Sequence, residues 1–263
     1  MCTKATVYMN EQEPRFHATL DNSKLGGLEC KIMAVGYVPG AGIDHFSDGR
    51  MITDCPGTCG AVDCSGCGLH GVCYAIDSHT RYMAKTINNV ENTMQLRSDM
   101  AAHFDDIYRA AVENNVDTIR YTESGEIENY EQFEHVIALA GQVPDKELYL
   151  YTKNYSVLDT FFGAGYELPE NVTVLISIWE STGVDAYERY KHHAGIKAFV
   201  VDNDSVQADA QCPAYILDES GTVVMNKAPA ARCGNCRLCT RARAAKVIRC
   251  LNHSKKNMTR RAR

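Results

Sequence analysis

The stretch NVTVLISIW, residues 171–179, is apolar almost throughout. A strand with one face in water alternates apolar and polar residues, so a nearly uninterrupted apolar run predicts a strand that is buried on both faces. Such strands are typical of parallel sheets that are covered by helices. This segment therefore indicates an α/β fold with a parallel sheet.

Strand and helix patterns alternate on both sides of this segment. The other strand patterns are KIMAVGYV (31–38), DTIRYT (117–122), ELYLYTK (147–153), KAFVVD (197–202) and AYILD (214–218). Apolar residues at helical spacing predict helices from Lys85 to about Asn114, from Tyr130 to Ala140, and over 185–193. The alternation favours helices packed on a parallel sheet, either open or closed into a barrel.

The size and the ends of the chain limit the class of protein. With 263 residues, 45% of them hydrophobic, the chain can build one large domain with a substantial core. The N-terminal residues MCTKATVYMNEQEPRF contain no apolar stretch that could act as a signal peptide, and no run of about 18 apolar residues predicts a membrane span. We therefore expect a cytoplasmic protein whose twelve cysteines are reduced ligands or catalytic thiols.

Charge is distributed unevenly. Residues 227–263 contain twelve Lys and Arg and no Asp or Glu, whereas the preceding part has a net charge of −18. A basic end on an acidic body indicates contact with nucleic acid or another polyanion, and a solvated tail is the alternative. We accordingly divide the chain into an α/β domain over 1–226, which includes a Cys-rich loop at 55–75, and a basic Cys-rich segment over 227–263.

The loop CPGTCGAVDCSGCGLHGVCYA, residues 55–75, holds five cysteines separated by three, four, two and five residues. Its glycines allow the backbone to wrap closely enough for several thiolates to meet at one metal ion or cluster. The cysteines are Cys55, Cys59, Cys64, Cys67 and Cys73. They exceed what one cluster needs, so the residues alone do not decide which of them are ligands.

A second group, Cys233, Cys236 and Cys239, has two residues between successive thiols. This spacing begins the bacterial ferredoxin pattern, in which a further cysteine is followed by proline. Cys212 precedes Pro213, and Cys250 is the other candidate for a fourth ligand. The spacing favours a 4Fe–4S cluster, and structural zinc is the alternative.

Polar residues stand at the predicted carboxyl ends of the strands, where parallel sheets bind ligands. Lys153 could bind a carboxylate or phosphate, Ser177 could contact a cofactor, and Asp202 could bind ribose hydroxyls. Each has a structural alternative as a solvated, core or turn residue. No G-x-S-x-G, P-loop or dinucleotide-binding glycine motif is present, so the common hydrolase, nucleotidase and dehydrogenase functions have no support.

An ordered set of short motifs resembles a known family. The motifs are NSKLG (22–26), CPG (55–57), CYA (73–75), YTESGE (121–126), LYLYTK (148–153) and CGNCRLC (233–239). In this order they resemble the phage and bacterial family called gene product 88, over most of the chain. That family is distantly similar to radical S-adenosylmethionine (SAM) proteins.

The resemblance implies a partial (β/α) barrel with a 4Fe–4S cluster held by three cysteines after the first strand. CPG and CYA carry the family match, so it points to Cys55, Cys67 and Cys73, with Cys64 as the next candidate. Radical SAM proteins space their three cysteines by three and then two residues. The nearest approach here, Cys59, Cys64 and Cys67, has four and two.

The resemblance also implies a site for SAM. Ser124, Gly125 and Glu126 stand where these proteins have a Gly-Gly-Glu motif that holds the SAM amino group, and Glu123 is an alternative to Glu126. Together with Lys153, Glu126 would form the catalytic site, while Ser177 and Asp202 would contact the cofactor.

The implied function is reductive cleavage of SAM, with an electron donor of the flavodoxin or ferredoxin type, to start radical chemistry. The substrate is unknown, and a nucleotide or nucleic acid is one candidate. The alternative is a zinc-stabilised phage protein that binds nucleic acid through its basic C-terminus and catalyses no reaction.

Overall fold

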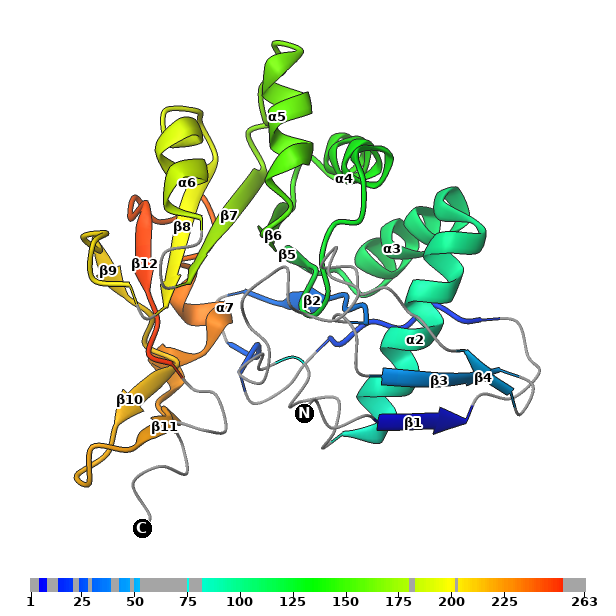
Figure 1. Ribbon diagram of the computed structural model, residues 1–263, viewed down its shortest axis with the longest axis horizontal. Coiled ribbons are helices and arrows are strands. Elements are labelled where there is room, and N and C mark those ends of the chain that lie inside the picture. The colour runs from blue at the N-terminus through cyan, green and yellow to red at the C-terminus, as the bar shows by residue number, and fades with distance from the viewer. Residues whose placement is uncertain are drawn as a thin grey trace.

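The computed structural model describes residues 5–8, 14–20, 24–27, 30–38, 43–47, 50–52, 75, 82–179, 183–201 and 203–252. Its centre is a seven-stranded sheet in the order β2-β5-β6-β7-β8-β12-β9, in which every neighbouring pair is parallel (Figure 1). The strands are β2 (Ile32–Ala34), β5 (Thr118–Tyr121), β6 (Glu147–Thr152), β7 (Val172–Trp179), β8 (Ile196–Val201), β9 (Ala210–Gln211) and β12 (Val247–Arg249). The expected α/β class with a parallel sheet is confirmed. Within the described residues β2 and β9 are the two edges of the sheet, so the partial barrel stays a prediction.

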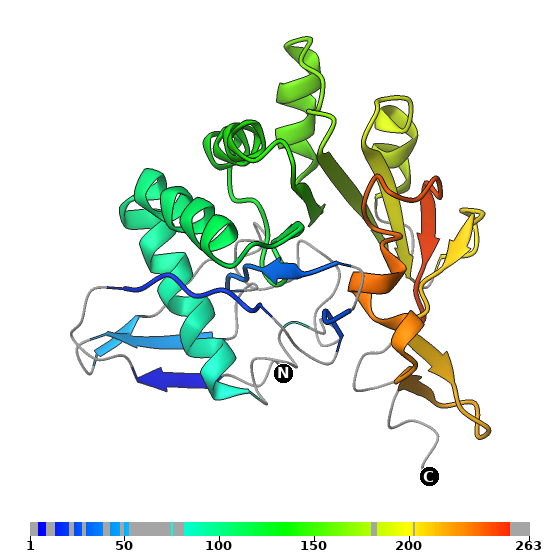
Figure 2. The same cartoon turned by 180° about the vertical axis from the view of Figure 1, so that it is seen from behind.

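Helices cover one face of this sheet. They are α2 (Met83–Ser98), α3 (Met100–Glu113), α4 (Tyr130–Gln142), α5 (Tyr155–Gly163) and α6 (Val184–Tyr190). Figures 1 and 2 show α3 to α6 following one another along the sheet. Their buried residues, such as Phe104 and Phe133, form one core with Ile119 and Val174 of the strands. Among the described residues, no helix combines the length and the apolar character that crossing a membrane requires.

The alternation of side chains along each strand gives the sheet two different buried faces. Leu148 and Leu150 of β6 belong to the core under the helices, whereas Tyr149 and Tyr151 point to the opposite side. We call this opposite side the inner face. It is covered by the connection between β9 and β12, residues 212–246, and Figure 2 shows the short helix α7 (Cys233–Cys236) of this connection.

β12 lies between β8 and β9, although it follows both in the sequence. The basic Cys-rich segment, as far as the structure describes it, is therefore built into the main sheet. The same connection contains the antiparallel hairpin of β10 (Tyr215–Leu217) and β11 (Val223–Met225) and a 3-10 turn, η1 (Pro229–Ala231). A second small sheet is formed by β1 (Ala5–Tyr8), β3 (Ile43–Ser47) and β4 (Arg50–Ile52).

Three details differ from the expectation. The helix predicted from Lys85 to Asn114 is two helices, because Asp99 leaves the helical conformation and caps α3 by accepting a hydrogen bond from the Ala102 N–H. Residues 214–218 contribute to the separate hairpin instead of the main sheet. Helix α5 lies between two predicted strands and was not expected.

Asp99 offers a test of the break between α2 and α3. We expect Asp99→Ala to lower the free energy of unfolding by about 1 kcal/mol, because one N–H at the start of α3 loses its cap. Asp105→Ala on the exposed side of the same helix is the control and should change stability by less than about 0.5 kcal/mol. Urea unfolding measures both, and equal losses would contradict the capping role.

Candidate metal centre

Four cysteines line one pocket on the inner face of the sheet. Three come from the connection around α7, namely Cys233, Cys236 and Cys239, and the fourth is Cys212, which directly follows β9. The remaining wall is formed by side chains of the sheet, including Arg120, Tyr149, Tyr151, Phe199 and Ile248. Cys250 does not line this pocket. The structure thus brings together the three thiols at two-residue spacing and the cysteine that precedes a proline.

Close backbone packing positions the first two of these thiols. The N–H groups of Cys233 and Gly234 donate to the carbonyls of Lys24 and Leu25, at 2.8 and 3.1 Å. A Cβ atom on Gly234 would stand 2.4 Å from the Cys30 carbonyl oxygen, so only glycine fits there. After α7 the chain turns through Arg237 in the left-handed region, with φ 53°, and this turn brings Cys239 back to the pocket.

A buried lysine fastens this connection to the sheet. Lys197 of β8 is only 5% exposed, and its ammonium donates hydrogen bonds to the carbonyls of Leu238, Thr240 and Arg243 at 2.9, 2.6 and 2.8 Å. A buried ammonium needs such partners because its desolvation is otherwise costly. Lys197 therefore fixes the loop on either side of the third thiol, Cys239.

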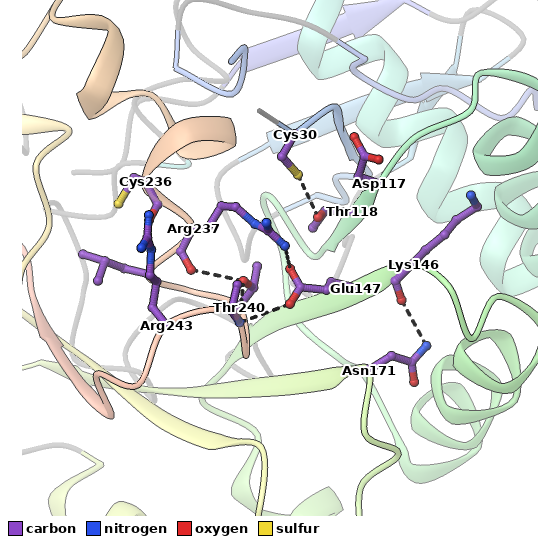
Figure 3. A network of polar contacts seen from close by, with 12 residues as sticks. Cys30, Asp117, Thr118, Lys146, Glu147, Asn171, Cys236, Arg237, Thr240 and Arg243 are labelled. Atoms are coloured by element: carbon purple, nitrogen blue, oxygen red, sulfur yellow. Dashed lines mark hydrogen bonds and ion pairs between the residues drawn. The ribbon is translucent and has the colours of Figure 1, made fainter. Parts of the chain in front are cut away.

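An ion pair adds a second attachment (Figure 3). Arg237 donates to one carboxylate oxygen of Glu147 at 2.8 Å, and the Ala242 N–H donates to the other at 3.2 Å. Glu147 is the first residue of β6, so the connection is held at the amino ends of the strands. Arg241 extends this attachment to β7, since it donates to the Val172 carbonyl at 2.8 Å.

The thiols differ in how readily they lose a proton. A hydrogen bond from the Cys250 thiol lowers the pKa of Cys212 to about 6, and the pKa of Cys250 is raised by the same contact. Burial raises the pKa of Cys239 to about 12, against the lowering effect of a hydrogen bond from Tyr151. Burial also raises the pKa of Cys236. Because a metal binds thiolates, its entry would displace protons from these thiols.

The donor set fits a metal–thiolate centre in its chemistry. Four thiols in one pocket suit zinc or an iron–sulfur cluster, both of which prefer soft sulfur ligands. Lys24 and Arg120 line the same pocket and bring positive charge to a site where thiolates would gather. In the part of the chain that the structure describes, no group of three or more Cys, His, Asp or Glu side chains is arranged so that it could hold a metal ion. The fit therefore rests on the identity of the donors and on their shared pocket.

The predicted SAM residues lie at the carboxyl ends of β5, β6 and β7. Glu126 is 3% exposed, and its two carboxylate oxygens accept from the backbone N–H groups of Ile127 and Lys153, at 2.9 and 2.7 Å. Burial raises the pKa of Glu126, and the nearby Lys153 opposes this. The structure thus brings Glu126 and Lys153 together.

Of the other residues of this predicted site, the structure gives backbone contacts and conformations. The Ser124 carbonyl accepts from the Tyr37 N–H at 2.9 Å, Gly125 has φ 84°, and the Ser177 carbonyl accepts from the Tyr155 hydroxyl at 3.0 Å. Cys55, Cys64, Cys67, Cys73 and Asp202 lie outside the described residues. Their roles, and those of the residues at this edge, stay predictions.

The sheet residues that surround the thiols were not expected from the sequence. Arg120, Tyr151 and Lys197 sit in strands that were recognised only by their apolar neighbours. A signal was present, because a charged residue in the middle of a strand buried on both faces needs a partner. The sequence did not show that this partner comes from a segment about 40 residues later.

Comparison with known proteins gives one match. The model of the family described as gene product 88 matches residues 16–244. No curated protein and no solved structure matches the chain. The match confirms the resemblance to this family. It covers the four pocket cysteines, helices α2 to α7 and every strand of the main sheet except β12.

Lys197 tests how the Cys-rich connection is held. We expect Lys197→Met to lower the free energy of unfolding by about 3 kcal/mol, because three buried carbonyls lose a charged donor. Limited proteolysis should then cut within residues 233–246 faster than in the unmodified protein. Lys191→Met removes an exposed lysine paired with Glu188 and is the control. Equal protection of the two variants would show that Lys197 does not hold the connection.

Proposed function

The chain belongs to the gene product 88 family, and on this premise we propose that it is an iron–sulfur protein whose C-terminal cluster is held by Cys212, Cys233, Cys236 and Cys239. The observation that carries the proposal is the convergence of these four thiols on one pocket. They come from two segments of the chain that are 21 residues apart, Cys212 after β9 and the three cysteines around α7. The C-x₂-C-x₂-C spacing with a Cys-Pro partner favours iron–sulfur over zinc.

Each part of the pocket would have a separate task. The four thiolates hold the cluster, and Ile248, Phe199 and Leu238 exclude water from it. Lys24 and Arg120 offset the negative charge of the thiolates. A bound cluster would supply one-electron transfer or fasten the connection to the sheet.

The choice between Cys212 and Cys250 as fourth ligand can be tested directly. We expect Cys212→Ser to lose most of the iron and sulfide, whereas Cys250→Ser keeps them, because only Cys212 lines the pocket. Cys30→Ser replaces a buried cysteine that hydrogen-bonds to Thr118 and is a second control. Anaerobic purification with iron, sulfide and zinc analysis, and absorption spectra before and after dithionite, measure the outcome.

About four irons for this site, with bleaching on reduction, would support the proposal. A colourless protein with zinc would contradict it. Loss of iron in Cys250→Ser with retention in Cys212→Ser would reverse the ligand assignment.

The resemblance to radical SAM proteins extends the proposal to an enzyme that cleaves SAM. Its support in the fold is the position of Glu126 and Lys153 at the carboxyl ends of neighbouring parallel strands, where α/β proteins bind ligands. A carboxylate can accept about four hydrogen bonds, so Glu126 could brace the backbone and also accept from the ammonium of SAM. Its role would be to orient SAM, and an electron donor of the flavodoxin or ferredoxin type would start the reaction.

We expect Glu126→Gln to weaken SAM binding about tenfold without loss of iron, because a charged hydrogen-bond acceptor becomes neutral. Glu128→Gln is the control, since Glu128 lies two residues further on and pairs with Arg97. Calorimetric titration of SAM into the anaerobic protein measures the affinity. Unchanged affinity in Glu126→Gln would remove this residue from the proposed site.

Nucleic-acid binding by the basic end stays the alternative prediction. The structure describes seven of its twelve cationic side chains, and four of these seven contact other parts of the chain. Arg237 binds Glu147, Arg241 the Val172 and Pro169 carbonyls, Arg243 the Cys236 carbonyl, and Arg249 Asp204. Two of these arginines, Arg237 and Arg249, pair with carboxylates, so their charge is offset within the chain.

A further inference from the structure

One side chain of the sheet contacts a thiol of the pocket directly. The hydroxyl of Tyr151 donates a hydrogen bond to the sulfur of Cys239, with 2.9 Å between the oxygen and the sulfur. Tyr151 lies in β6, and Cys239 lies 88 residues further along the chain. The contact therefore exists only because the Cys-rich connection folds onto the inner face.

Neighbouring rings fix the direction of this hydroxyl. Phe199 of β8 meets the Tyr151 ring edge to face, with 5.1 Å between the ring centroids, and Tyr149 meets it at 6.0 Å. Both neighbours belong to strands of the same sheet, which is rigid compared with a loop. The O–H group is thus directed towards the sulfur of Cys239 without a bound metal or cluster.

A cation lies over the same ring. The guanidinium carbon of Arg120 is 5.2 Å from the centroid of the Tyr151 ring, and both side chains line the pocket. Arg120 is 5% exposed, so little water screens its charge. A positive charge over the ring draws electron density from the phenol and strengthens its O–H group as a donor.

From this arrangement we infer that Tyr151, together with the positive charge of Arg120 over its ring, raises the reduction potential of the cluster proposed for this pocket. The inference rests on the proposed function, because it needs a redox-active group on Cys239. A hydrogen bond to a ligand sulfur withdraws negative charge from it, and a nearby cation favours the more negative, reduced state. Both residues are positioning residues, since neither is a ligand.

Tyr151→Phe removes only the hydroxyl and is the main test. Tyr149→Phe is the matched control: Tyr149 lines the same pocket two residues earlier on β6, and within the described residues its hydroxyl donates to no cysteine sulfur. We expect Tyr151→Phe to keep the iron and sulfide of the unmodified protein but to show a more negative midpoint potential. Tyr149→Phe should keep both unchanged. Redox titration followed by visible absorption measures the potential, and metal analysis measures the content.

Arg120→Met provides a second test that leaves the hydroxyl in place, and it should shift the potential in the same direction. If both variants carry the cluster at the potential of the unmodified protein, the inference is overturned while the proposed function stands. If Tyr151→Phe loses its iron, Arg120→Met decides by the same criterion. An unmodified protein without iron would overturn the proposed function, and the inference would fall with it.

Discussion

The ammonium of Lys197 has to be satisfied on a sheet face that water does not reach, and this requirement organises the C-terminal half of the molecule. β8 cannot bury this residue without hydrogen-bond acceptors around it, and the carbonyls that accept belong to the loop on either side of Cys239. The sheet and the Cys-rich connection are consequently one structure. Cys239 lies in the pocket with Arg120 and Tyr151 because the loop that carries it also supplies the carbonyls that bind Lys197.

The two faces of the sheet carry different side chains and therefore need different covers. On the helix side, Leu148, Leu150 and Val174 need only apolar neighbours, which helices α2 to α6 provide. On the inner face, Arg120 and Lys197 alternate with aromatic residues, and this mixture needs a partner with many backbone carbonyls and polar side chains. The connection of residues 212–246 offers such groups where its chain is irregular, whereas a long helix uses most of its carbonyls internally.

The sequence was sufficient for the features that depend on local periodicity and spacing. The apolar run at 171–179 predicted a buried parallel strand, and β7 is one. The grouping of Cys233, Cys236 and Cys239 followed from their spacing. The proline after Cys212 marked that residue as a candidate partner, and the pocket contains it.

Other features were hidden by a continuing local pattern or depend on contacts between distant segments, and sequence patterns do not show them. Apolar periodicity continues through Asp99, so the break between α2 and α3 was hidden, although Asp is a common N-cap. β12 has three residues and no distinctive pattern. Whether a polar residue in a strand faces water or a pocket depends on what covers that face, and Arg120 and Tyr151 were missed for this reason.

The insertion of β12 between β8 and β9 has a consequence for how the protein forms. β9 has no partner until the chain has passed through the whole connection and returned with Val247–Arg249, so its pairing closes a long loop at an entropic cost. A cluster bound by both Cys212 and the thiols around α7 would shorten this loop before β12 pairs with β8 and β9. Loading of the pocket and completion of the sheet edge would then be one cooperative event, and a nascent chain that ends before Val247 would expose β8 as an unpaired edge.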